Sequence, residues 1–131
     1  MLKLYGSITS PYVRRLRIWL ANTEHEFINL QIFAEQDRQL LAANNPTMKI
    51  PMLEDVTDDS VRVIYDSRII YRYLTDKFDD PLLNWEQENQ LTLIDSANDS
   101  LVQMFILSNS DIQPDEDKLF FKLQKERVNA V

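Results

Sequence analysis

Short apolar segments in the first half of the chain predict four β-strands. Residues 2–5 (LKLY) alternate apolar and polar side chains and end at Gly6 in a polar loop. Residues 27–32 form a mostly apolar run, which is typical of a strand covered on both faces. A polar turn separates residues 52–53 from residues 61–65 (VRVIY), and this pattern predicts an antiparallel hairpin.

Apolar residues at helical spacing predict helices between these strands. The first is expected over residues 11–21, with Ser10 as its N-cap and a proline behind it. The second is expected over residues 35–43, and a third begins at Ser67, which suits an N-cap. The resulting order, βαβαββα, predicts an α/β domain over residues 1–80 with a mixed four-stranded sheet and helices on both faces, the thioredoxin-like arrangement.

From about residue 82 the pattern becomes all-helical. Apolar residues over 91–105 predict one long helix that ends near Ser108. Pro114, followed by three acidic residues, predicts the start of another helix, because acids are favourable at the positive end of the helix dipole. That pattern runs to the last residue without a C-cap, so we expect residues 81–131 to be an incomplete all-α portion that looks truncated.

Composition excludes several classes of function. The net charge of −7 argues against nucleic acid or an anionic membrane as the main partner. Without cysteine, any thiol chemistry must use the sulfur of a substrate, and a single glycine cannot build a Gly-rich phosphate loop. His25, the only histidine, has no neighbours at ligand spacing, so we expect no metal. Without a signal-like or membrane-spanning run, a cytoplasmic protein is expected.

The stretch NPTMKIPML, residues 45–53, combines a turn with the start of a buried strand. Pro51 has no N–H and cannot lie in a central strand, so we expect it to open the strand and hold the loop before it. A cis Ile50–Pro51 bond would present the backbone N–H and C=O of Ile50 to a ligand. Only about 5–6% of such bonds are cis, so the pattern alone leaves the isomer open.

Three motifs together carry a resemblance to a known family. SPYVRRLRI, NPTMKIPML and YDSRIIYRYL occur in this order and spacing. The chain resembles the N-terminal half of the glutathione transferase superfamily, above all its bacterial members and stringent starvation protein A, a noncatalytic relative. The resemblance covers residues 1 to about 80, and the helical stretch from 82 fits the start of that family's second domain.

The resemblance implies roles for the loop that ends at Pro51. Pro51 matches the family's cis-proline, and Ile50 before it would pair through its backbone with the cysteinyl part of glutathione. Lys49 matches a frequent lysine near the glycine carboxylate of that ligand. Met48 stands where the family often has glycine.

Asp66 and Ser67 match the family's acidic-Ser pair, which receives the γ-glutamyl end; the family more often has Glu-Ser. The chemistry of the residues agrees. Ser67 at a helix start offers a hydroxyl and a free N–H to a carboxylate, and the helix dipole favours the anion. We expect Asp66 to pair with the ammonium of the ligand unless an arginine such as Arg68 or Arg72 neutralises it.

Ser10 is the candidate for thiol activation. A thiol of pKa near 8.5 needs a shift of about two units, or about 2.7 kcal/mol, to be mostly thiolate at pH 7. A hydrogen bond to a charged group contributes roughly 1.5–3 kcal/mol and a helix N-terminus up to about 2 kcal/mol, so a hydroxyl before the first helix suffices. Thr9 and Ser7 are rivals for this role. Tyr5, in the first strand, is interpreted as a core residue.

The resemblance implies a glutathione S-transferase that uses glutathione as a substrate, activates its thiol for a small electrophile, and forms a homodimer. The alternative is a noncatalytic interaction or regulatory protein of the same fold, similar to stringent starvation protein A. A thioredoxin-type peroxidase or disulfide reductase is disfavoured because the chain has no cysteine. Arg14, Arg15 and Arg17 lie mostly off the apolar stripe of the first helix and are interpreted as a solvated face.

Overall fold

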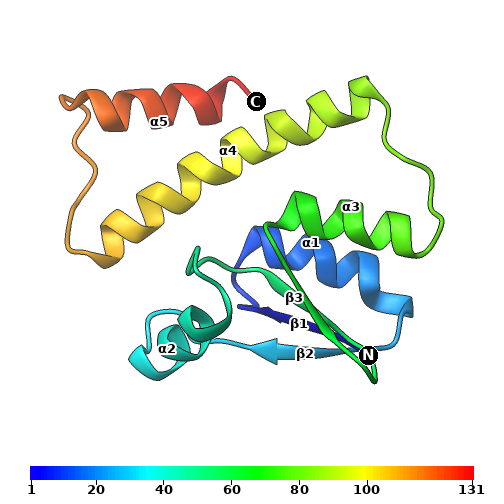
Figure 1. The fold of residues 1–131 in the computed structure, drawn as a ribbon. Helices are drawn as coiled ribbons and strands as arrows, with labels where there is room; N and C mark the ends of the chain where they lie inside the picture. The colour runs from blue at the N-terminus through cyan, green and yellow to red at the C-terminus, as the bar shows by residue number, and fades with distance from the viewer. The chain divides into compact units, whose positions relative to one another are not determined.

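The computed structural model describes residues 1–131 and divides the chain into two compact units, Met1–Leu82 and Leu83–Val131 (Figure 1). The first unit contains, in order, β1 (Leu2–Gly6), α1 (Pro11–Trp19), a short 3₁₀ turn (Leu20–Asn22), β2 (His25–Asn29), α2 (Glu35–Asn44), β3 (Met52–Val56), β4 (Val61–Tyr65) and α3 (Ser67–Lys77). The second unit contains α4 (Trp85–Asn109) and α5 (Leu119–Asn129).

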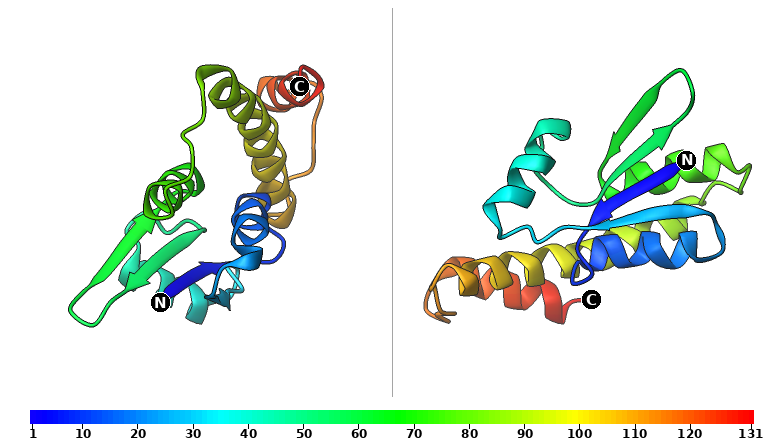
Figure 2. Two further views of the ribbon diagram at one scale, coloured as in Figure 1. Left: turned by 90° about the vertical axis from the view of Figure 1, so that its right-hand side faces the viewer. Right: turned by 90° about the horizontal axis from the view of Figure 1, so that it is seen from below.

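The four strands form one mixed sheet in the order β2-β1-β3-β4. β1 runs parallel to β2 and antiparallel to β3, and β3 and β4 form the antiparallel hairpin that the sequence predicts. α1 and α3 lie side by side along one face of the sheet, and α2 lies on the other side (Figures 1 and 2). This topology confirms the predicted thioredoxin-like α/β arrangement.

Alternation along the strands supplies a separate apolar core to each face. The core under α1 and α3 consists of Leu2, Leu4, Leu16, Leu20, Leu53, Ile64, Ile70 and Leu74. The smaller core under α2 consists of Leu30, Leu41 and Met52. At the border of the larger core, the ring of Trp19 lies 6.2 Å from that of Tyr71 and 5.7 Å from that of Phe78, measured between centroids. Each large apolar side chain that is fully buried in these two cores stabilises the fold by about 1.5–3 kcal/mol.

β2 differs from its prediction. The apolar run over residues 27–32 predicts a strand covered on both faces, but β2 is an edge strand whose residues are only partly buried or exposed. The strand begins at His25, opposite Leu2, and the chain leaves it at Leu30, which turns into the smaller core. Part of the apolar run therefore belongs to the loop that leads to α2.

The second unit also differs at one helix start. α4 begins at Trp85 with a capping box, in which Asn84 and Gln87 each accept the other's backbone N–H. α5, however, begins at Leu119 instead of Pro114. The carboxylate of Asp115 accepts the N–H of Asp117 at 3.0 Å, so this acidic segment forms a side-chain-stabilised turn instead of a helix.

The two helices of the second unit pack against each other, with Ser100 of α4 and Gln124 of α5 both buried. Trp85, the first residue of α4, is 87% exposed. Although α4 is 25 residues long, neither it nor any other helix is long and apolar enough to cross a membrane.

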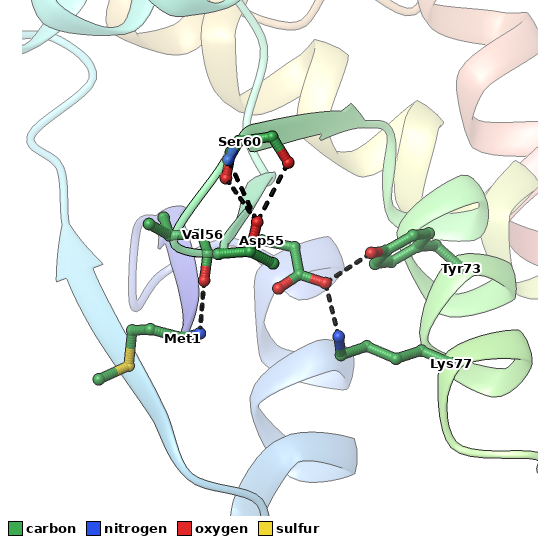
Figure 3. A network of polar contacts seen from close by, with 7 residues as sticks. Met1, Asp55, Val56, Ser60, Tyr73 and Lys77 are labelled. Atoms are coloured by element: carbon green, nitrogen blue, oxygen red, sulfur yellow. Dashed lines mark hydrogen bonds and ion pairs between the residues drawn. The ribbon is translucent and has the colours of Figure 1, made fainter.

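A buried carboxylate joins the sheet to α3. Asp55 on β3 accepts hydrogen bonds from the Tyr73 hydroxyl at 2.5 Å and the Lys77 ammonium at 2.7 Å (Figure 3). The amino group of Met1 donates to the carbonyl of Val56, the next residue of that strand, at 2.8 Å. Burial of the Asp55 carboxyl opposes its ionisation, but the hydrogen bonds from Lys77 and Tyr73 outweigh burial and lower its pKa. The C-terminal half of α3 is thereby anchored to the strand beside it.

Gly6, the only glycine, is needed for space and not for backbone freedom, because its φ is not positive. A β-carbon at this position would lie 2.4 Å and 2.7 Å from the two γ-carbons of Val13. Val13 itself is fully buried in the first turns of α1. The missing side chain therefore lets α1 approach the end of β1 closely.

We expect Gly6→Ala to lower the free energy of unfolding by about 1–3 kcal/mol, because the new methyl group overpacks the contact with Val13. Urea denaturation followed by circular dichroism measures this change. The double variant Gly6→Ala with Val13→Ala removes both colliding methyl groups. It should be at least about 1 kcal/mol more stable than the sum of the two single effects predicts, and strictly additive effects would contradict the contact.

Aspartates end two helices in the left-handed conformation that usually favours glycine. Asp79 has φ 54° directly after α3, and the N–H of Asp80 donates to the carbonyl of Thr75 at 2.9 Å, which is a Schellman motif. Asp111, with φ 60°, ends α4 in the same way. Each aspartate has a β-carbon in a crowded conformation and a negative charge at the negative end of a helix dipole.

Asp79→Gly should therefore raise the free energy of unfolding by about 1 kcal/mol, since relief of the left-handed strain and of the charge exceeds the entropic cost of glycine. Thermal unfolding measures the effect. Asp76→Gly, three residues earlier inside α3, is the matched control and should destabilise by about 1 kcal/mol. A lower melting temperature for Asp79→Gly would contradict the capping role.

Candidate functional site

A buried amide organises the loop before β3. Asn45 is fully buried; its Nδ2 donates to the carbonyl of Lys49 at 2.7 Å. Its Oδ1 accepts the N–H of Thr47 at 2.9 Å and the hydroxyl of Thr47 at 2.7 Å. The loop ends at the Ile50–Pro51 peptide bond, which is cis. One side chain thus holds the loop at two residues, Thr47 and Lys49.

The loop residues for which the sequence indicates roles differ in their exposure. Ile50 is partly buried against the smaller core, so its backbone is held at the start of β3. Lys49 is exposed, which leaves its ammonium accessible to an anion. Met48 has φ 54° and is 56% exposed, so this position takes the left-handed conformation with a methionine.

The start of α3 differs from its prediction by one residue. Asp66, not Ser67, is the N-cap: its carboxylate accepts the N–H groups of Arg68 at 2.9 Å and Ile69 at 3.4 Å. The backbone of Asp66 is in a left-handed conformation, with φ 69°. Its ionised carboxylate is a stronger acceptor for first-turn N–H groups than the Ser67 hydroxyl, which explains the shift of the cap by one residue. Ser67 becomes the first helical residue and is buried. Its N–H is one of the first-turn donors without a partner inside the helix.

Arg15 links the start of α3 to α1. Its guanidinium Nη2 donates a hydrogen bond to the hydroxyl of Ser67, a residue 52 positions away in the chain. The guanidinium also lies 5.8 Å from the centroid of the Tyr12 ring. Arg15 is partly buried, whereas Arg14 and Arg17 are exposed. The interpretation of these arginines as a solvated face is therefore wrong for Arg15, which the sequence pattern did not single out.

The three candidate hydroxyls before α1 have different partners. Ser7 is buried, and its Oγ lies 2.9 Å from Oγ1 of Thr9 and accepts the N–H of Thr9 at 3.3 Å. Ser10 caps α1, with its Oγ accepting the N–H of Val13 at 3.3 Å. A hydroxyl that accepts this bond still has its own proton to donate. Ser10 therefore combines a donor with a helix N-terminus.

Two other polar side chains take part in local structure. The Tyr5 hydroxyl donates to Glu54 at 2.9 Å, and burial followed by this hydrogen bond raises the pKa of Tyr5 to about 12. Its ring packs on the smaller core, in agreement with its interpretation as a core residue. Nδ1 of His25 lies 2.8 Å from the carbonyl of Thr23. No group of three or more acidic or histidine side chains is placed to hold a metal ion.

The sheet register brings the candidate residues to one edge. Tyr5 of β1 lies opposite Met52 of β3, which lies opposite Tyr65 of β4. The segments that directly precede or follow these three residues therefore emerge at the same edge of the sheet. They are residues 6–10, 45–51 and 66–67. This edge carries a hydroxyl at a helix N-terminus, a backbone held by a proline and a second helix start, an arrangement suited to an extended peptide-like anion.

Comparison with known proteins identifies relatives of this arrangement. Residues 4–82 match the family profile described as "Glutathione S-transferase, N-terminal domain". A glutathione S-transferase from Methylobacillus flagellatus with glutathione bound is similar in structure, with a TM-score of 0.77 and 23% identity over 99% of this chain and 66% of that one. No curated protein matches the sequence significantly.

Two further solved structures show the range of similarity. A glutathione S-transferase from Methylobacterium radiotolerans, in complex with glutathione sulfonate, has a TM-score of 0.75 and 23% identity over 98% of this chain and 62% of its own. Glutathione transferase E6 from Drosophila melanogaster is 29% identical with a TM-score of 0.56, over 80% of this chain and 48% of its own. The chain thus spans 66% or less of the length of the three structures described.

We expect Asn45→Ala to lower the free energy of unfolding by about 2–3 kcal/mol, because it leaves the carbonyl of Lys49 and the groups of Thr47 without their buried partner. Chemical denaturation measures the loss. Asn44→Ala is the matched control: its side chain is exposed and donates only to the carbonyl of Leu40 at 3.3 Å, so the change should stay within about 0.5 kcal/mol. Equal effects of the two substitutions would contradict the role of Asn45.

Proposed function

Because the chain belongs to the glutathione S-transferase family, we propose that residues 1–80 bind glutathione and activate its thiol for conjugation to a small electrophile. Residues 81–131 are then the start of the family's helical domain. The observation that carries this proposal is the meeting of three segments at one sheet edge, where the Ser10 hydroxyl lies at the N-terminus of α1. The bound glutathione of the Methylobacillus flagellatus structure supports the choice of ligand.

In the proposed complex, each end of glutathione has its own partner. The backbone of Ile50 pairs with the cysteinyl part, since Pro51 holds it at the start of β3. The exposed ammonium of Lys49 attracts the glycine carboxylate. Ser67 receives the γ-glutamyl carboxylate through its hydroxyl and N–H, and Asp66 accepts the ammonium. The hydrogen bonds from Arg68 and Ile69 occupy Oδ1 of Asp66, and the carboxylate has further lone pairs for this contact.

Ser10 stabilises the thiolate in this proposal. Its Oγ accepts the N–H of Val13, so the hydroxyl proton is the part of the group that remains to be donated to sulfur. The dipole of α1 adds to this stabilisation because Ser10 is the N-cap. A hydrogen bond made only to the charged form lowers the pKa of the thiol. The thiol proton passes to solvent, and the thiolate forms the new C–S bond with its electron pair. In a substitution the electrons of the broken bond depart with the leaving group, and in an addition those of the broken π bond pass to the neighbouring atom of the electrophile.

A second candidate is a noncatalytic interaction or regulatory protein of the same fold. The observation that favours it lies in the second unit, where several large apolar side chains are at least 46% exposed: Leu93, Ile94, Leu101, Phe105, Ile106 and Leu119. Exposed apolar surface of this extent is typical of interaction sites. The same surface supports the proposal of a homodimer, in either functional case. A cytoplasmic location stays a prediction from composition.

The protein should be retained on immobilised glutathione and eluted by millimolar free ligand. Ser10→Ala should stay bound to the column but raise the pKa of the bound thiol by about one to two units, because the thiolate loses a charge-assisted hydrogen bond. Absorbance of the thiolate as a function of pH measures the shift. Ser10→Thr keeps the hydroxyl and is the matched control, with a pKa near that of the unmodified protein.

Three results would count against these assignments. Failure to bind glutathione at millimolar concentration removes the transferase proposal. An unchanged thiol pKa in Ser10→Ala, with an increase in Thr9→Ala or Ser7→Ala, moves the activating role to one of those hydroxyls. Glutathione binding without conjugation of a generic electrophile favours the noncatalytic candidate.

A further inference from the structure

The contact between Arg15 and Ser67 fixes the polarity of the Ser67 hydroxyl. A guanidinium has only donors, whereas a serine hydroxyl has one donor and two acceptor lone pairs. Because Arg15 donates to Oγ of Ser67, the serine must act as the acceptor in that bond. The proton of the hydroxyl then points away from the guanidinium, toward any other acceptor within reach.

The surroundings of Ser67 add further donors of the same kind. Ser67 is the first residue of α3, so its own N–H and the positive end of the helix dipole lie at this position. The carboxylate of Asp66 is turned to the N–H groups of Arg68 and Ile69. An anion placed at Ser67 therefore meets a hydroxyl proton, a helix N-terminus and a nearby guanidinium. A cation at Ser67 itself would face the guanidinium and the positive end of the helix dipole, so the ammonium of the ligand is favoured only at the carboxylate of Asp66.

We propose that Arg15 is a positioning residue that holds Ser67 as a hydrogen-bond donor and so selects the α-carboxylate of the ligand's γ-glutamyl group, in preference to its ammonium, at the start of α3. The inference rests on the proposed function, because it concerns the same ligand. It adds a determinant of ligand orientation that lies on α1, outside the three segments that meet at the sheet edge. Arg15 acts through Ser67 and does not itself touch the sulfur.

Arg14 provides a matched control for Arg15. Both arginines lie on α1, and removing either changes the net charge equally. Arg14 is exposed, whereas Arg15 is partly buried with its guanidinium beside the Tyr12 ring and on Ser67. A general loss of positive charge would appear in both variants, and a specific loss only in the Arg15 variant.

The test compares three ligands by isothermal titration calorimetry. They are glutathione, an analogue without the α-carboxylate (4-aminobutyryl-cysteinyl-glycine) and an analogue without the α-ammonium (glutaryl-cysteinyl-glycine). Arg15→Gln should weaken glutathione and the glutaryl analogue by about tenfold or more, as expected for a charge-assisted contact. The 4-aminobutyryl analogue should bind Arg15→Gln and the unmodified protein equally. Arg14→Gln should leave all three affinities unchanged.

Further variants separate positioning from general support of the fold. Arg15→Lys keeps a cationic donor and should recover part of the affinity for glutathione, while the pKa of the bound thiol stays constant across the Arg15 variants. Ser67→Ala should show the same ligand selectivity as Arg15→Gln. Arg15→Gln in the Ser67→Ala background should then weaken binding no further, because the two residues act as one unit.

Each outcome supports or overturns a definite statement. If the unmodified protein does not bind glutathione, the proposed function fails. If it binds glutathione but Arg15→Gln behaves like Arg14→Gln, the inference about Arg15 fails and the function stands. Equal weakening of all three ligands by Arg15→Gln would reduce Arg15 to a structural role. If Arg15→Gln does not fold, the ligand selectivity of Arg15→Lys and Ser67→Ala decides between these readings.

Discussion

The close approach of Gly6 and Val13 determines where α1 lies on the sheet, and the candidate site depends on that position. Val13 belongs to the first turns of α1, and it lies in the chain between the N-cap Ser10 and Arg15. Any side chain at position 6 would push this segment outward. A shift of α1 would move the Ser10 hydroxyl relative to the edge of the sheet and the Arg15 guanidinium relative to Ser67. One absent β-carbon therefore sets the spacing between the two helix starts of the site.

The second constraint is the way the loop before β3 is held in place. Asn45 is buried under the loop that leads to Pro51, and its amide makes both donor and acceptor contacts with that loop. The loop backbone therefore does not need to form regular structure to have its polar groups satisfied. Site residues on this loop are held by a polar side chain, whereas those on α1 are held by apolar packing. The two halves of the candidate site thus have different sensitivities to mutation.

Sequence patterns predicted the elements whose stabilising contacts are local. The Ser10 cap acts on Val13, three residues away, and a short turn joins β3 to β4, so the sequence alone predicts both the cap and the hairpin. The edge position of β2 depends on pairing with β1, more than 20 residues away, and its apolar run alone does not reveal it. α5 starts late because Asp115 stabilises a turn with hydrogen bonds that compete with the first helical turn.

In the site, the motif resemblance implies roles for Ile50, Asp66 and Ser67, but it assigns none to Arg15 or Asn45, although both lie within the motifs. Arg15 stood among other arginines off the apolar stripe, and its partner is 52 residues away. Asn45 stood in a helix-ending Asn-Asn-Pro segment, where a turn explains the residues without any buried role. The Arg15 contact forms only when α1 and α3 are both in place, which is information that a local pattern does not contain. The hydrogen bonds of Asn45 are local, with Thr47 and Lys49, and it is the burial of its side chain that the local pattern does not reveal.

The two tryptophans give the chain one optical label in each compact unit. The indole of Trp19 packs against Tyr71 and Phe78, while that of Trp85 is 87% exposed. Only Trp19 changes from an apolar to an aqueous environment when the chain unfolds, so intrinsic fluorescence reports mainly on the α/β unit. Far-ultraviolet circular dichroism, in contrast, reports on the helices of both units. Whether the two signals change together or apart therefore reveals whether the units unfold as one cooperative body.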